Sequence, residues 1–188
     1  MTRKEQKEER KKQILFTALN LFVTKGYYDT KITDIAEAAS MSTGLLFHYF
    51  ESKEDLLLEL VKMGADSTKS VSQAEADNPD KYFEGFLNML FEYANKQPWV
   101  FQMFVLMGQA RRVGMPEDVR KIALSVDMIS NSAKLIEQGQ KAGCFKDGDP
   151  KLLATCFWTA VQGIMEEMAF DKGMSAPNPE WIMAILRK

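Results

Sequence analysis

Residues 32–53 limit the possible folds of this chain more than any other segment, because they predict two short helices joined by a tight turn. The first helix is expected over about residues 32–39, where apolar side chains recur on one face. Ser42 is a good N-cap for a second helix over Thr43 to Tyr49. This is the arrangement of a helix-turn-helix, in which the start of the second helix can enter a DNA major groove.

Matches to one known pattern continue on both sides of this stretch, over about residues 9–63. They lie in the helix before it, in the turn that follows, and in the segment that closes the motif: Arg10, Ile14, Ala18, Leu21, Phe22, Gly26-Tyr27, Thr30, Ile32-Thr33, Asp34-Ile35-Ala36, Ser42, Gly44, Tyr49-Phe50, Ser52-Lys53-Glu54 and Leu56. In these residues the chain resembles the DNA-binding domain of tetracycline-repressor-type (TetR/AcrR) transcription regulators. It departs from them at Phe47, where the family usually has a tyrosine whose hydroxyl reaches a phosphate.

The resemblance implies an all-α fold of about nine helices. A three-helix DNA-binding domain would occupy residues 1–63, and a helical ligand-binding and dimerisation domain residues 64–188. It further implies a homodimer on double-stranded DNA with a near-palindromic operator, and a repressor that a small, largely apolar effector releases.

The second helix of the motif would carry the residues that touch bases. Thr43 and His48 face outward there, Leu45 could contact a thymine methyl, and Gly44 would let the backbone approach DNA closely. The alternatives are a tolerated surface glycine and an ordinary surface histidine. Phosphate contacts, which set register without reading sequence, are expected from Tyr49, Lys53 and either Thr30 or Thr33 at the start of the preceding helix.

Charge alone does not indicate a nucleic-acid binder, because the net charge is −2. The first twelve residues differ, with six basic side chains against three acidic ones. This arm could lie beside phosphates, or it could be a solvated helix end with pairs such as Lys4 and Glu8.

The rest of the chain has helical periodicity and no convincing strand. Asn78-Pro79 and Gln97-Pro98 predict helix starts. One long helix is expected from Pro116 to about Lys141, another from Pro150 to about Phe170, and a short one after Pro179.

Aromatic and methionine side chains in this part suit a pocket for apolar ligands, although most such residues form ordinary core. The expected pocket wall comprises Phe83, Phe86, Trp99, Met103 and Met107. A stripe of small residues beside an apolar stripe in the 150–170 helix predicts a dimer interface, with Cys156, Phe157, Ala160, Gly163 and Ile164.

Several classes of function are disfavoured. One histidine and no nucleophile motif speak against an enzyme, and we expect neither a metal site nor a cofactor. The two cysteines fit a reduced cytoplasmic protein, and no apolar run is long enough for a membrane span. Two alternatives stay open: a helical small-molecule carrier or enzyme with an incidental helix-turn-helix, and a regulator controlled by a protein partner.

Overall fold

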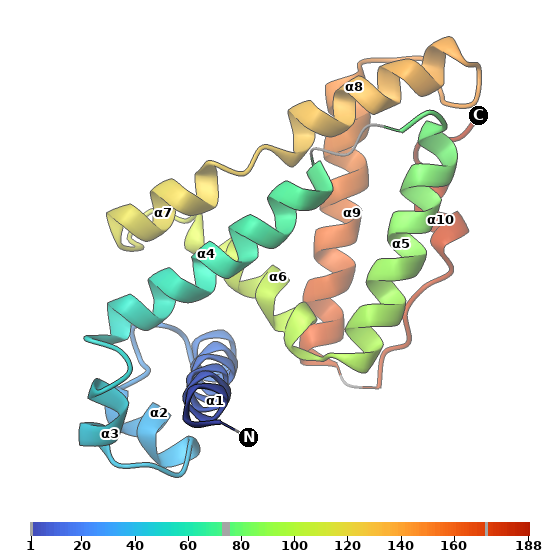
Figure 1. The fold of residues 1–188 in the computed structure, drawn as a ribbon. Helices are drawn as coiled ribbons and strands as arrows, with labels where there is room; N and C mark the ends of the chain where they lie inside the picture. Colours follow the sequence, from blue (N-terminus) through green and yellow to red (C-terminus); the bar gives the residue numbers. More distant parts are fainter. Residues whose placement is uncertain (1, 73–75, 172) are drawn as a thin grey trace.

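The computed structural model describes residues 2–72, 76–171 and 173–188. Within these residues the chain is all-α, as predicted, and Figure 1 shows a small head joined to a larger bundle. The elements are α1 (Arg3–Thr24), α2 (Ile32–Ala38), α3 (Thr43–Phe47), α4 (Lys53–Ser72), α5 (Pro79–Lys96), α6 (Trp99–Ala110), α7 (Glu117–Leu124), α8 (Met128–Lys141), α9 (Pro150–Phe170) and α10 (Pro179–Met183). None of the helices described is long and apolar enough to cross a membrane.

Most helix starts follow from local capping. Ser42 accepts a hydrogen bond from the Leu45 amide (3.2 Å), Asn78 from Lys81 (3.1 Å), and Asn178 from Glu180 (3.0 Å). Each of these side chains satisfies an amide that has no partner within its own helix.

The predicted helix from Pro116 to Lys141 is wrong, because the chain breaks at Ser125 and begins again at Met128. Asp127 accounts for the new start, since its carboxylate accepts a hydrogen bond from the Ser130 amide (2.9 Å). The apolar periodicity of the sequence continues across the break, so the pattern alone did not indicate that Asp127 caps a new helix.

Two hydrophobic cores underlie the shape, and we call them the head core and the bundle core. The head core joins α1–α4 with Met103, Leu106 and Ala110 of α6 and with Val119 and Ala123 of α7. The bundle core lies among α5, α8, α9 and α10, with the first turn of α6 at its edge. Trp99 packs against both cores, so α6 belongs to both parts of the molecule.

The head is therefore continuous with the bundle beyond the expected boundary near Met63. α4 runs unbroken from the head to α8 (Figure 1). The Phe16 ring of α1 stacks on the Trp99 ring at 5.1 Å between centroids, and the Gln102 amide donates to Asn20 (2.7 Å). The Tyr28 hydroxyl also donates to the Gly114 carbonyl. A shift of α6 therefore reaches the head through several contacts.

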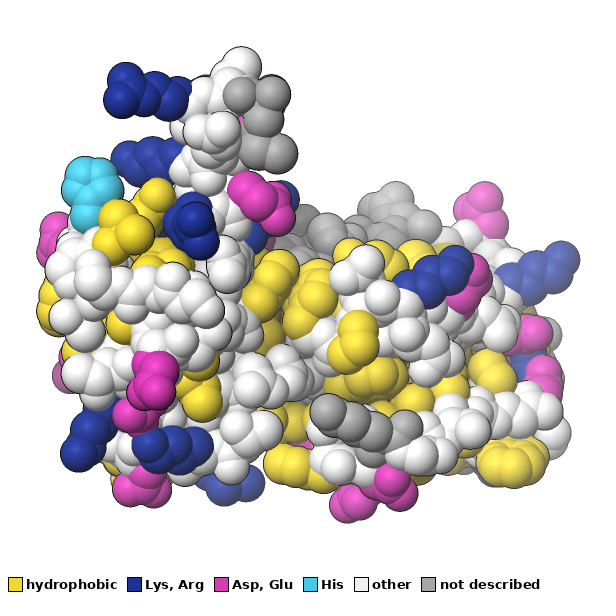
Figure 2. Space-filling model, turned by 90° about the horizontal axis from the view of Figure 1, so that it is seen from below, with side chains coloured by type: hydrophobic (Ala, Val, Ile, Leu, Met, Phe, Trp, Pro, Cys, Tyr) yellow, Lys and Arg dark blue, Asp and Glu magenta, His cyan; other side chains and the backbone are white. Residues whose placement is uncertain are grey.

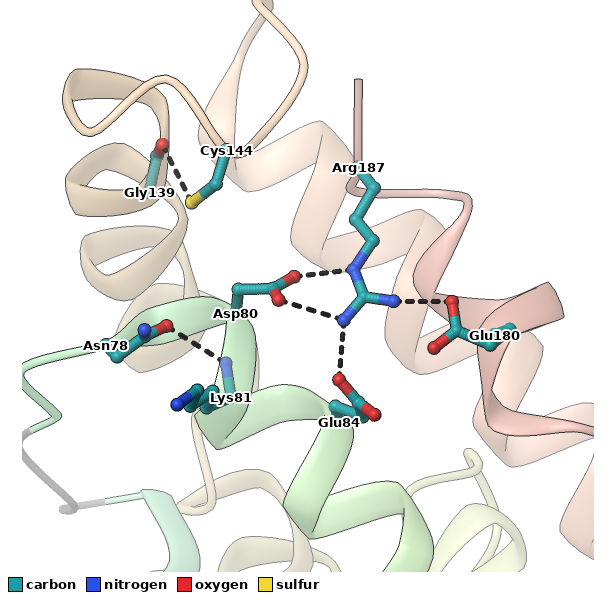
Figure 3. A network of polar contacts seen from close by, with 8 residues as sticks. All are labelled: Asn78, Asp80, Lys81, Glu84, Gly139, Cys144, Glu180 and Arg187. Atoms are coloured by element: carbon teal, nitrogen blue, oxygen red, sulfur yellow. Dashed lines mark hydrogen bonds and ion pairs between the residues drawn. The ribbon is translucent and has the colours of Figure 1, made fainter.

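Arg187 connects the C-terminal residues to α5 and α10 through several ion pairs. The Arg187 guanidinium binds both carboxylate oxygens of Asp80 (2.6 and 2.9 Å) and one oxygen of Glu84 (2.6 Å), and it also pairs with Glu180 (Figure 3). These carboxylates raise the pKa of Arg187, with Asp80 contributing most. Because Asp80 and Glu84 lie in the first turns of α5, the network fastens that helix to the chain end.

Candidate nucleic-acid interface

α3 exposes one face and buries the other. Leu46 is fully buried in the head core, as is nearly all of Phe50. Leu45 and Phe47 are 42% and 50% exposed, and His48 is exposed as well. An exposed leucine and phenylalanine on so short a helix leave an apolar surface for an outside partner.

Gly44 lies in the first turn of this exposed face. A Cβ atom placed on Gly44 would meet no atom within 4 Å. Packing inside the protomer therefore does not require a glycine here, although glycine is unfavourable in a helix by about 1 kcal/mol. The open space at Gly44 leaves room for a partner's surface to approach the backbone of α3.

Four of the other predicted contact residues are accessible to a partner. Thr43 and Tyr49 are half-buried, Thr33 is exposed, and the His48 ring packs edge-to-face on Tyr49 with 5.7 Å between centroids. Thr33 lies in the first turn of α2, near the turn that leads to α3.

Thr30, by contrast, is buried inside the head, so the predicted phosphate contact of its side chain is wrong. Its hydroxyl donates to the Gly26 carbonyl (2.7 Å), and its side chain is 0% exposed. Of the two threonines that the sequence left open, only Thr33 is exposed.

Lys53 is also used internally. Its ammonium donates to the carbonyls of Tyr27 and Thr30 (2.8 Å each) and lies 4.4 Å from the centre of the Tyr27 ring. Burial lowers the pKa of Lys53, and the nearby Asp29 carboxylate, which raises this pKa, offsets only part of the effect. An ammonium has only three donors, so Lys53 holds the turn between α1 and α2 and is a poor phosphate ligand.

An ion pair and a capping box hold the start of α2. The Asp34 carboxylate pairs with Lys25 and accepts a hydrogen bond from the Lys31 amide (3.0 Å). The Lys25 ammonium, followed by that amide, lowers the pKa of Asp34. These contacts position Thr33 relative to α1.

An open groove joins the start of α1 to α3. It is lined by Arg3, Lys4, Gln6, Lys7, Glu9, Arg10 and Gln13 of α1, and by Leu45 and Tyr49. Sequence reasoning did not predict this juxtaposition, because it brings together residues about forty positions apart. The available signal was the spacing of Arg3, Lys7 and Arg10, which places them on one face of a helix.

The predicted pocket wall does not form one surface. Phe83 is fully buried in the bundle core, where its ring packs on Phe145 and Phe157. Met103 and Met107 belong to the other core, beside Gly64 of α4. The prediction of a single wall is therefore wrong, because these residues divide between two separately packed clusters, with Phe86 in the first and Trp99 touching both.

The predicted dimer residues all lie on α9, and all but Phe157 are exposed or half-buried. Cys156 and Gly163 are exposed, and Ala160 and Ile164 are half-buried. Phe157 is fully buried, with its ring 5.1 Å from that of Phe83, so its inclusion was wrong. The exposed stripe of α9 comprises Leu152, Thr155, Cys156, Thr159, Gly163, Glu167 and Phe170.

Comparisons with known proteins agree with this geometry. Residues 14–60 match the family model for bacterial regulatory proteins of the tetR family. The HTH-type transcriptional regulator HbdR of Aromatoleum sp. (strain CIB) is 45% identical over 60 residues, which are 32% of this chain and only 26% of that protein.

The fold of the whole chain resembles solved structures. The MbdR regulator from Azoarcus sp. CIB superposes with a TM-score of 0.79 over 94% of this chain and 96% of its own, at 24% identity. AibR, in its complex with isovaleryl coenzyme A and operator DNA, gives a TM-score of 0.73 at 21% identity over 93% and 94% of the two chains. The family model assigns residues 14–60 to the tetR family of bacterial regulatory proteins, and the chain as a whole has the fold of these solved regulators.

Proposed function

We propose that this protein is a homodimeric DNA-binding regulator whose α3 helix reads the major groove. The observation that carries the proposal is the outward face of α3, where Gly44 borders open space and Leu45, Phe47 and His48 are exposed. Thr43, Gly44, Leu45 and His48 would contact base edges, while Thr33 and Tyr49 would contact phosphates.

A two-fold dimer would present two copies of α3. On a near-palindromic operator these helices enter successive major grooves about 34–36 Å apart. The exposed stripe of α9 supports this assembly, because small side chains allow close approach of a second helix. In a two-fold interface a residue near the axis faces its own copy, which would bring the two Cys156 side chains together.

Repression relieved by a small molecule is the simplest form of regulation for this fold. The structure of AibR with isovaleryl coenzyme A and operator DNA supports it by analogy. In this chain the contact between α4 and α6 is the place where a ligand would act. A Cβ on Gly64 would lie 2.6 Å from the Met107 sulfur, so a ligand displacing this flexible side chain would move α4 and, with it, α3.

DNA binding is tested with a duplex from the region upstream of the gene, by fluorescence anisotropy at several salt concentrations. We expect salt-sensitive binding that weakens at least tenfold when Thr43→Ala and Tyr49→Phe are combined, which corresponds to about 1.4 kcal/mol. No salt-sensitive binding by the parent protein, or unchanged binding by the double variant, would refute the assignment.

The dimer is tested by oxidation with copper phenanthroline, followed by electrophoresis without reductant. Cross-linking requires Cα atoms within about 7 Å, so a disulfide-linked dimer is expected that disappears in Cys156→Ser and persists in Cys144→Ser. A protein that sediments as a monomer at micromolar concentration would contradict this part of the proposal.

A further inference from the structure

The start of α1 projects from the head. Every residue from Thr2 to Arg10 is exposed, and the first buried side chain is Ile14. The segment is nevertheless helical from Arg3, because Thr2 and Glu5 form a capping box: the Thr2 amide donates to Glu5 (2.7 Å), and the Glu5 amide donates to the Thr2 hydroxyl (3.2 Å). A capped helix that packs against nothing in its own protomer is available to a partner.

Charges are segregated around this projecting helix. Successive residues of an α-helix are about 100° apart, since 3.6 residues make one turn. At that spacing five basic residues lie within a sector of about 120°, and the three glutamates lie in the opposite half together with Lys12. The basic face comprises Arg3, Lys4, Lys7, Arg10 and Lys11, and the acidic face Glu5, Glu8 and Glu9.

The basic face points toward α3. Arg3, Lys4, Lys7 and Arg10 line the open groove whose other side is formed by Leu45 and Tyr49. Figure 2 shows Lys and Arg side chains along this protrusion, beside the histidine and a group of hydrophobic side chains. Lys12 instead lines a second hollow on the other side of α1, with Phe16 and Asn20.

Two basic residues make polar contacts within the protomer. Lys11 forms an ion pair with Glu59 (2.7 Å), so we leave it out of the binding surface. Arg10 donates one hydrogen bond to Gln13 (3.0 Å), and a guanidinium has five donors. Arg3, Lys4 and Lys7 show no ion pair within the part of the chain that the structure describes.

We propose that the projecting start of α1 is a second DNA-binding element, which lies along the phosphate backbone next to the groove that α3 enters. This inference rests on the proposed function, and it enlarges the surface of the protein that contacts DNA. Double-stranded DNA is the favoured partner because Leu45 of α3 and Tyr49, just after it, line the same groove. The contacts are to phosphates, so they add affinity and salt dependence without reading sequence.

The arrangement also explains how a nearly neutral head can bind DNA. Residues 1–55 contain nine basic and nine acidic side chains, so net charge provides no attraction. Four basic side chains of the arm line the groove beside Leu45 and Tyr49, together with one glutamate, Glu9, whereas Glu5 and Glu8 do not line it. Local potential at the DNA, rather than the sum of charges, then governs the association.

The test compares Lys7→Ala with Lys12→Ala, which remove the same side chain from opposite faces of one helix. The triple variant Arg3→Ala/Lys7→Ala/Arg10→Ala enlarges the effect, and circular dichroism checks that α1 stays helical. Each lost phosphate contact reduces the steepness of log K against log salt by about 0.9, so the triple variant should lose about 2.7 per protomer, or about 5.4 for the homodimer. Lys12→Ala should leave the slope unchanged.

Two duplexes distinguish this inference from the proposed function. The loss should be equal on the upstream duplex and on an unrelated duplex of equal length, because phosphate contacts are independent of sequence. A triple variant with the parent slope would overturn the inference and leave the reading role of α3 intact. The inference would also be overturned if the triple variant lost binding to phosphatidylserine vesicles while its binding to DNA stayed unchanged. That result would assign the arm to a membrane surface. A parent protein that binds neither duplex would refute the proposed function itself.

Discussion

Two glycines show how differently the head and the bundle use their sequence. A Cβ on Gly44 of α3 would meet nothing within 4 Å, whereas a Cβ on Gly139 of α8 would lie 2.2 Å from the Phe145 ring. Gly139 is explained by packing within the protomer, since the fully buried Phe145 takes the place of a side chain. Packing within the protomer does not explain Gly44, and the DNA contact that we propose would explain it.

The same contrast holds for the polar groups. In the bundle, Arg187 is enclosed by carboxylates from both α5 and the chain end, and the Trp158 ring nitrogen donates to Ser132 (2.7 Å). In the head, the side chains of Lys53 and Thr30 donate hydrogen bonds to backbone carbonyls of the same domain. The outward side chains of α3, by contrast, are exposed. Function is therefore expected where the protomer leaves side chains unused.

The largest effect should come from Gly139→Ala. The new methyl group must displace the Phe145 ring, and such overpacking costs about 3 kcal/mol of unfolding free energy. Denaturant titration measures the loss. Gly85→Ala is the matched control, because Gly85 is exposed on α5 with nothing near its Cβ, and it should gain up to about 1 kcal/mol. Equal stability of the two variants would contradict the assigned packing.

Arg187→Met should cost about 2 kcal/mol, because Asp80 and Glu84 then repel each other without a cation between them. Thermal unfolding of the variant is compared with that of Asp80→Asn/Glu84→Gln/Arg187→Met, which removes the repulsion as well. We expect the multiple variant to recover part of the lost stability. If the multiple variant is less stable than Arg187→Met alone, the Arg187 network does not stabilise the protein through charge.

Gly44→Ala should separate stability from function. The helix gains up to about 1 kcal/mol, while the methyl group blocks close approach of the backbone and weakens binding to the upstream duplex about tenfold, or about 1.4 kcal/mol. Gly85→Ala again serves as the control, with the same gain in stability and unchanged DNA binding. Parallel changes in both variants would mean that Gly44 is a tolerated surface glycine.

The smallest effect concerns acid stability. The Lys25 ammonium lowers the pKa of Asp34 below its usual value of 3.8, so the folded state binds that proton less readily than the unfolded state. Its contribution is therefore present above about pH 4 and is lost as the pH falls through the lowered pKa. Asp34→Asn should make unfolding less dependent on pH in this acid range, as measured by thermal unfolding at several pH values. Identical pH profiles for Asp34→Asn and the parent would contradict this role.

Local patterns made part of the fold predictable. Ser42 and Asn78 were expected at helix starts because a cap depends only on residues two or three positions away, and the structure has helices at those starts. The exposed face of α3 followed from helical period in the same way. The break before Met128 was equally local, but a continuous apolar pattern outweighed a single aspartate.

The sequence by itself determined the helices, their caps and the family-specific motif, since each of these depends on residues close together along the chain. Only the tertiary structure decided which polar side chains remain available. It buried the Thr30 hydroxyl, committed the Lys53 ammonium to two carbonyls, and turned the basic face of α1 toward α3. These outcomes depend on contacts between residues far apart in the sequence, and such contacts are set by how whole helices pack rather than by any local pattern.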